Sequence, residues 1–347
     1  MKAGQPPGEA LQISIILCTC GRAESCARTV AAIGQIEVPA GLTCELALVQ
    51  NGPLDPAETN AGDTILANGI VLRTYHEAQT GKSWALNTGL ARARGDIFVF
   101  TDDDIIPPPD WLEKLTGPIR RGEADGVAGD VRIPPHLDPH WLPPAQRAWL
   151  ADMGALALGN SGRMVGGNMA CSRSVLKKVV GFDVELGPGG WFGYGEDTLF
   201  SEQLRNAGFR IVDVLDATVE HHFLPRRLER ENWLQAARKM GRTDAYFSHH
   251  WWHAQWSHPY WALVKATLRL AVCRLHSRAR MPVATDPALP RLADATRHFA
   301  ACLQYLAERN RPVRHIRRNS AQPSAADRGT AADTAAASPH LRANKPG

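Results

Sequence analysis

The sequence predicts an α/β protein with a mostly parallel sheet, helices on its faces and a helical C-terminal extension. Two observations predict this class. Short apolar, β-branched runs alternate with helical patterns over residues 12–105, and polar or turn residues follow three of those runs. Such alternation is typical of parallel sheets covered by helices. Because ligands of these sheets bind beyond the carboxyl ends of the strands, we expect the functional residues there.

Four apolar runs in the first part of the chain have the length of buried strands. They are Ile13–Cys18, Glu45–Val49, Ile70–Thr74 and Asp96–Phe100. Apolar residues at helical spacing lie between them, from Cys26 to Ile33 and again within 82–94. The later part, 106–245, is predicted to add a helix near 110–121, strands at 127–133 and 211–215, and a helix that opens at Glu196.

Three consecutive acids, Asp102, Asp103 and Asp104, end the strand that precedes Pro107. Three carboxylates at the end of a buried strand repel one another and are costly to desolvate, unless a cation lies among them. Asp102 and Asp104 are two residues apart, so on an extended chain they point the same way. Oxygen ligands suit Mg²⁺ or Mn²⁺, and either ion would bind a diphosphate. The alternative is a solvated acidic turn.

Two further groups carry candidate chemistry. Glu196 and Asp197 open an amphipathic helix behind a loop of glycines and aromatic rings, where a carboxylate could serve as a general base. The alternative is an ordinary acidic helix start. His221 and His222 follow the last strand, and either could complete an oxygen-rich metal site, although histidines at such positions also serve structure alone.

Composition bears on the partners and on the cellular compartment of the protein. The net charge of +4 gives no argument for nucleic acid, and we expect no nucleic-acid partner. Seven cysteines show neither paired nor zinc-like spacing, which indicates reduced thiols. The segment Met1–Gln12 lacks the order of a signal peptide. These features predict a cytoplasmic protein with a flexible N-terminus at 1–11 and a disordered tail at 319–347.

Residues 249–280 combine tryptophans, histidines and basic residues around an apolar helix. Tryptophan beside a basic, apolar helix is typical of segments that lie at a membrane surface. The stretch therefore predicts peripheral attachment at the inner face of the cell membrane. A helical hairpin packed on the catalytic domain, or a dimer contact, is the alternative.

Several pieces recur in an order that resembles the family 2 glycosyltransferases of the GT-A fold, over residues 12–245. They are a first strand ending T-C-G-R, the turn V-Q-N-G, the segment G-K-S-W-A-L-N-T-G-L, the strand D-I-F-V-F-T-D-D-D, the segment G-G-N-M-A, the helix start G-Y-G-E-D-T-L-F and the end V-E-H-H. The resemblance implies a nucleotide-binding half at 12–105 and an acceptor half at 106–245. The tryptophan-rich, basic composition after it predicts a separate helical extension at 246–318.

The resemblance also assigns roles to individual positions. It makes Asp197 the catalytic base with Glu196 beside it, and it makes Asp102, Asp104 and His221 the metal contacts, with His222 as the neighbouring alternative. It places Asp103 with the nucleotide-binding residues, which are Thr19, Arg22, Gln50, Asn51, Lys82 and Asn87. It places Gly166, Gly167 and Asn168 near the donor sugar, where the rings of Trp191 and Tyr194 could stack on a sugar.

The resemblance implies an inverting transfer of a hexosyl or N-acetylhexosaminyl group, assisted by Mn²⁺ or Mg²⁺. The donor would be a nucleotide sugar, with a UDP-sugar favoured. The acceptor would be a carbohydrate or a lipid-linked molecule, in glycan, cell-surface polysaccharide or glycolipid synthesis. Family members often carry an acid that contacts the base where this chain has Gln50 and Asn51, so the base stays open. A nucleotidyltransferase and a non-catalytic sugar- or lipid-binding protein on the same fold are the alternatives.

Overall fold

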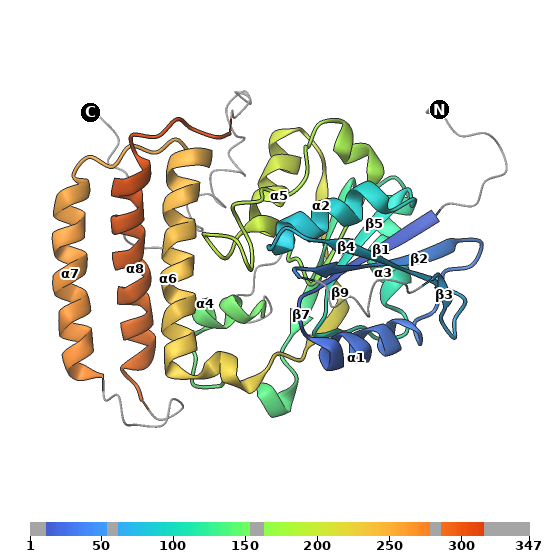
Figure 1. The fold of residues 1–347 in the computed structure, drawn as a ribbon, viewed down its shortest axis with the longest axis horizontal. Coiled ribbons are helices and arrows are strands. Elements are labelled where there is room, and N and C mark those ends of the chain that lie inside the picture. The colour runs from blue at the N-terminus through green and yellow to red at the C-terminus, as the bar shows by residue number, and fades with distance from the viewer. Residues whose placement is uncertain (1–11, 54–61, 153–162, 278–285, 316–347) are drawn as a thin grey trace. The chain divides into compact units, whose positions relative to one another are not determined.

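The computed structural model describes residues 12–53, 62–152, 163–277 and 286–315 (Figure 1). The N-terminal segment 1–11 and the tail 319–347, for which flexibility and disorder are predicted, lie outside these ranges. The chain divides into two compact units. The first, here called the sheet unit, contains Met1–His136, Leu150–Gly190 and Glu196–His222. The second, the helical unit, contains Leu137–Trp149, Trp191–Gly195 and Phe223–Gly347, so it takes in residues that sequence assigned to the acceptor half.

The sheet unit is built on one nine-stranded sheet in the order β3-β4-β2-β1-β5-β8-β7-β9-β6 (Figure 1). The strands are β1 (Gln12–Thr19), β2 (Thr43–Asn51), β3 (Thr64–Ile65), β4 (Val71–Glu77), β5 (Ile97–Asp102), β6 (Ile105–Ile106), β7 (Gly126–Arg132), β8 (Asn168–Ser172) and β9 (Ile211–His221). The helices with it are α1 (Ala23–Ile33), α2 (Lys82–Arg92), α3 (Trp111–Arg120) and α5 (Glu196–Asn206).

The sheet is parallel where the sequence alternation is clearest and mixed elsewhere. Strands β4, β2, β1 and β5 pair in parallel, in that order. Beyond β5 the pairing changes, because β8 runs antiparallel to both β5 and β7, whereas β9 is parallel to β7. The sheet is therefore less uniformly parallel than predicted. Its parallel part brings the ends of β1, β2 and β5 to one edge.

Alternating side chains of β1 place two apolar layers on the two faces of the sheet. Ile13, Ile15 and Leu17 pack on one face with residues of α1 and α3, while Ile16 packs on the other with residues of α2. All four side chains are fully buried. Because successive strand residues point to opposite faces, a strand that is apolar throughout must be covered on both sides. This burial fixes the register, and with it the position of the polar residues that end the strand.

The helical unit contains α4 (Pro144–Arg147), α6 (Arg230–Tyr246), α7 (Pro259–His276) and α8 (Leu289–Glu308). Helix α8 packs against both α6 and α7 (Figure 1). The backbones of α6 and α8 approach closely at Gly241, where a Cβ atom would lie 2.0 Å from the carbonyl oxygen of Arg297. The same Arg297 guanidinium donates two hydrogen bonds, of 2.7 and 2.8 Å, to the carboxylate of Asp244.

The first part of the stretch predicted to lie at a surface is buried instead. Phe247–Trp251 forms a π-helical turn after α6, and His249, His250 and Trp251 are each less than 10% exposed. Nε2 of His250 lies 3.1 Å from the carboxylate of Glu308, which gives that buried carboxylate a partner inside the helical unit. Sequence reasoning missed this burial because histidine and tryptophan occur both in cores and at surfaces. Among the described helices, none is both long and apolar enough to cross a lipid bilayer.

Candidate active site

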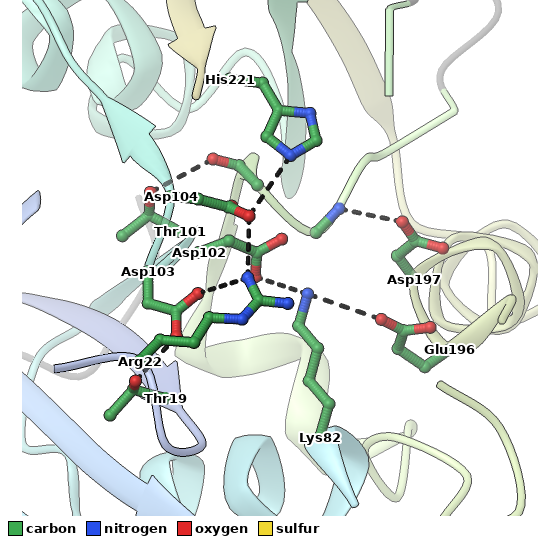
Figure 2. Close-up of polar contacts among 12 residues, drawn as sticks. Thr19, Arg22, Lys82, Thr101, Asp102, Asp103, Asp104, Glu196, Asp197 and His221 are labelled. Atoms are coloured by element: carbon green, nitrogen blue, oxygen red, sulfur yellow. Dashed lines mark hydrogen bonds and ion pairs between the residues drawn. The ribbon is translucent and has the colours of Figure 1, made fainter. Parts of the chain in front are cut away.

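Polar side chains of the sheet unit gather where β1 and β5 end (Figure 2). Strand register places Cys18 of β1 beside Asp102 of β5, and Thr19 beside Gln50 of β2. The buried runs before these residues end at the same level, so the polar residues that follow share one edge. This is the edge at which ligands of parallel sheets bind.

Arg22 links the acids that follow β5. Its Nη1 atom lies 3.0 Å from Oδ1 of Asp103 and 2.8 Å from Oδ2 of Asp104. The Thr19 hydroxyl donates a 2.7 Å hydrogen bond to Asp103. Asp103 is buried, and this burial raises the pKa of its carboxyl, although Arg22 opposes the change. The predicted nucleotide turn and the acid cluster therefore form one ionic network.

Lys82, the first residue of α2, joins the acid cluster to the start of α5. Its ammonium lies 2.5 Å from Oδ1 of Asp102 and 3.5 Å from Oε1 of Glu196. These acids raise the pKa of Lys82, although burial acts against them. Burial raises the pKa of Glu196 to about 7, the charge of Asp197 adds to the change, and Lys82 opposes it. One cation thus connects two carboxylates from distant parts of the sequence.

Asp197 lies at the N-terminus of α5 and bonds to the backbone of the glycine pair Gly166-Gly167. Its Oδ2 accepts a 2.9 Å hydrogen bond from the N–H of Gly166, and its Oδ1 accepts a 2.6 Å bond from the N–H of Thr198. A Cβ atom on Gly166 would lie 3.1 Å from Nζ of Lys82, and one on Gly167 would lie 3.6 Å from Oδ2 of Asp102. The glycine pair therefore passes between Asp102 and Asp197. Asp102, Lys82, Glu196 and Asp197 line one site (Figure 2).

The structure distinguishes the two histidines that end β9. Nε2 of His221 lies 3.5 Å from Oδ2 of Asp104, whereas Nε2 of His222 lies 2.9 Å from the carboxylate of Glu220. Nδ1 of His221 lies 2.7 Å from the carbonyl oxygen of Leu150, which can only accept a hydrogen bond. In the neutral ring the hydrogen is thus on Nδ1, and the Nε2 lone pair faces Asp104. This is the arrangement of a metal-ligating histidine whose orientation is set by a backbone carbonyl.

The acids and His221 fit a metal site that a substrate would complete. Across the described ranges, no three His, Cys, Asp or Glu side chains already form a metal-binding group. Mg²⁺ at phosphate sites is usually bound by one or two carboxylates, with phosphate oxygens and waters as the other ligands. Asp102 and Asp104 supply such carboxylates, and His221 supplies a nitrogen that Mn²⁺ also accepts.

Three of the predicted ligand-contacting asparagines use their side chains within the fold. The amide of Asn51 bonds to the backbone of Glu77, Gln79 and Gly81. Asn87 donates to and accepts from the backbone of Phe182. Asn168 is fully buried, donates to the carbonyls of Asp130 and Ala217, and accepts from Nε1 of Trp111. These bonds hold the loops around the site, and contact of the three residues with sugar or nucleotide stays a prediction.

Two residues predicted to stack on sugar, Trp191 and Tyr194, belong to the helical unit. Trp191 is 62% exposed, and the guanidinium of Arg242 lies 4.9 Å from the centre of its ring. Their contact with a sugar stays a prediction. The carbonyl of Leu150, which orients His221, was missed from the sequence, because a backbone contact leaves no residue-type signal.

Comparison with known proteins finds solved structures with the predicted fold and a family model that matches part of the chain. The search of solved structures aligns the chain with a mannosyltransferase from Pyrobaculum calidifontis, solved in complex with GDP-Man and Mn²⁺. The two share 19% identity over 85% of this chain and 86% of that one, with a TM-score of 0.54. At this identity the likeness shows the fold, which is GT-A.

Weaker likenesses include a glucosyl-3-phosphoglycerate synthase from Mycobacterium tuberculosis, in complex with Mn²⁺, UDP-glucose and phosphoglyceric acid. It is 21% identical over 69% of this chain and 83% of that chain, with a TM-score of 0.44. Residues 1–349 of S. aureus TarS are 15% identical over 83% and 89% of the two chains, with a TM-score of 0.45.

The fold is that of the GT-A glycosyltransferases. Residues 14–180 match the family described as Glycosyl transferase family 2. A search of curated proteins finds no match.

Proposed function

We propose that this chain is a metal-dependent, inverting glycosyltransferase that moves a sugar from a nucleoside-diphosphate donor to an acceptor hydroxyl. One observation carries the proposal: Asp102, Lys82, Glu196 and Asp197 line one site, on either side of the Gly166-Gly167 backbone. Acids suited to binding a metal ion and a candidate base thus lie close together, although they come from segments far apart in the chain. The mannosyltransferase with the same fold was solved with a nucleotide sugar and Mn²⁺, which supports a donor and an ion of this kind.

On the donor side of the site, positively charged groups would neutralise the diphosphate of the donor. Asp102, Asp104 and His221 would hold Mn²⁺ or Mg²⁺, which when bound neutralises the charge developing on a diphosphate leaving group. Arg22 and Lys82 lie against the same acids, so a diphosphate at this position would receive charge-assisted hydrogen bonds from both cations. Gly167 lets the backbone pass close to Ile105 and Asp102, because a Cβ atom there would lie 3.2 Å from the Ile105 side chain and 3.6 Å from Oδ2 of Asp102.

The acceptor side depends on Asp197. A hydroxyl is a poor nucleophile until a base accepts its proton, and Asp197 is the more exposed of the two acids that begin α5. Its Oδ1 accepts from both the N–H and the hydroxyl of Thr198, whereas its Oδ2 accepts from the N–H of Gly166 and has a second lone pair for an acceptor hydroxyl. Glu196 is buried against Lys82 and positions that cation. Attack opposite the leaving group then inverts the anomeric carbon.

The substrate classes follow from the site and the family. We infer a hexosyl or N-acetylhexosaminyl donor and a carbohydrate or lipid-linked acceptor, in glycan, cell-surface polysaccharide or glycolipid synthesis in the cytoplasm. A UDP-sugar is the donor that the sequence favours, while the mannosyltransferase of the same fold carries a GDP-sugar. Because the Asn51 amide is bound to backbone, Gln50 is the remaining predicted residue at the end of β2 to face the base.

The test is nucleoside diphosphate release from a panel of UDP- and GDP-sugars, with acceptor glycans, in Mn²⁺ and in EDTA. We expect Mn²⁺-dependent release that Asp197→Asn abolishes without changing the melting temperature. The matched control is Asp110→Asn, because Asp110 is exposed and paired with Lys114 outside the site. Release of pyrophosphate would instead indicate a nucleotidyltransferase, and donor binding without turnover would indicate a binding protein.

A further inference from the structure

Helix α7 of the helical unit has two apolar faces, and α8 covers one of them. Pro259, Ala266 and Leu270 are buried, and Leu270 packs with Leu292 and Ala295 of α8. In Figure 1, α7 lies on the far side of α8 from α6. The opposite face, here called the outer face of α7, consists of side chains that are 45% to 86% exposed: Tyr260, Trp261, Val264, Leu268, Val272 and Leu275. A contiguous exposed patch of this kind marks an interaction surface.

The outer face is a stripe with basic edges. At about 100° per residue, positions 261, 264, 268, 272 and 275 fall on one side of the helix. On the same count, Lys265 and Arg269 lie along one edge of the stripe and Arg274 along the other. All three side chains are exposed, and Pro259–His276 contains no aspartate or glutamate. The helix therefore presents apolar surface between two rows of positive charge.

Aromatic residues and cations also meet at the N-terminal end of this face. The ammonium of Lys265 lies 5.5 Å from the centre of the Trp261 ring, and the guanidinium of Arg309 lies 5.1 Å from that of Tyr260. Tryptophan and tyrosine favour the boundary between lipid headgroups and acyl chains, because each ring has an apolar body and a polar tip. These aromatic and basic residues therefore match a surface whose interior is apolar and whose boundary carries negative charge.

We propose that the outer face of α7 docks on an anionic lipid bilayer, with the helix lying in the plane of the headgroups. The six apolar side chains enter the acyl boundary, and Lys265, Arg269 and Arg274 contact the lipid phosphates. A second copy of the chain fits this face less well. A twofold pairing of two outer faces would bring basic edges together with no acid on either helix to offset them.

The inference is tested by flotation of the full-length protein with vesicles of phosphatidylcholine alone and with about one-third phosphatidylglycerol. We expect the wild type to float with the anionic vesicles only. Leu268→Gln/Leu275→Gln removes apolar contact, and Lys265→Glu/Arg274→Glu reverses charge on both edges. Each pair is expected to weaken binding by at least about tenfold, since a single basic residue near the surface already changes affinity several-fold. Leu303→Gln, on the 53% exposed Leu303 of α8, is the control and retains binding.

Circular dichroism and melting temperature establish that each variant is folded, which the exposure of the substituted residues favours. Equal flotation of the two double variants and the wild type overturns the proposal, as does failure of the wild type to bind anionic vesicles. Loss of a dimer in analytical ultracentrifugation on Leu268→Gln/Leu275→Gln, without any vesicle binding, would assign the face to a second copy. Transfer to a soluble acceptor is measured separately, so neither outcome affects the proposed reaction.

Discussion

Replacing Glu196 by glutamine should make the protein more stable at high pH than the wild type. The Glu196 side chain is only 6% exposed, and burial raises the pKa of its carboxyl from the ordinary 4.5 to about 7. Between these values the unfolded chain has released a proton that the folded chain still holds. Unfolding therefore becomes easier as pH rises from about 4.5 to about 7, and the stability that the neutral acid provides is lost above pH 7.

The size of the effect follows from the two pKa values. A difference of about 2.5 between folded and unfolded states corresponds to about 3 kcal/mol in the free energy of unfolding. Glutamine has nearly the same shape and no proton to release, so the variant lacks this pH-dependent loss. Relative to the wild type, the Glu196→Gln protein should gain up to about 3 kcal/mol between pH 5 and pH 8.

Urea unfolding followed by tryptophan fluorescence, with EDTA present at both pH values, measures this gain. Glu24→Gln, at an exposed position of α1, is the control for loss of one carboxylate and should show no comparable gain. If the difference between wild type and Glu196→Gln is the same at pH 5 and pH 8, the carboxyl of Glu196 does not titrate as described. The inference that burial of this carboxyl outweighs the opposing charge of Lys82 would then be refuted.

Two further predictions concern the metal site and the packing beneath it. Arg22→Ala should bind Mn²⁺ more tightly by about fivefold, in calorimetry without donor, because the guanidinium no longer competes for the acid cluster; unchanged affinity would show that the two cations do not compete. Gly89→Ala should lower the free energy of unfolding by about 1–3 kcal/mol, because its Cβ would lie 2.5 Å from Cγ2 of Ile16. Gly62→Ala, which meets open space, is the matched control, and an equal effect of both changes would contradict this packing.

The parts of the site that lie at ends of buried strands could be predicted from sequence. Ile13–Cys18 is apolar at successive positions, which requires a strand covered on both faces, and the polar residue after it then marks the edge of the sheet. The same reasoning located Asp102–Asp104, whereas Glu196 and Asp197 were located as the acids that open an amphipathic helix. That the two groups share one site through Lys82 was visible only in the structure, since spacing along a chain does not give distances across a fold.

Other features depend on tertiary contacts that leave no periodic signal. Antiparallel β8 between β5 and β7 is one example, because the apolar period of a strand does not name its neighbours. Asn168 is another, because two glycines precede it and its three bonding partners lie 38 to 57 residues away. The alternation of residue types along β9 did contain a signal that favours His221 over His222. Val219 and His221 share the buried face of β9, whereas Glu220 is exposed.

The central claim is that a divalent ion on Asp102 and Asp104 holds the diphosphate of a nucleotide sugar. Calorimetry of the UDP- and GDP-sugar panel, with Mn²⁺ and with EDTA, tests it most directly in the wild type and in Asp104→Ala. We expect at least one nucleotide sugar to bind the wild type only when Mn²⁺ is present, and Asp104→Ala to lose that binding while keeping its melting temperature. Binding of the same sugar by both proteins, with or without Mn²⁺, would contradict the claim.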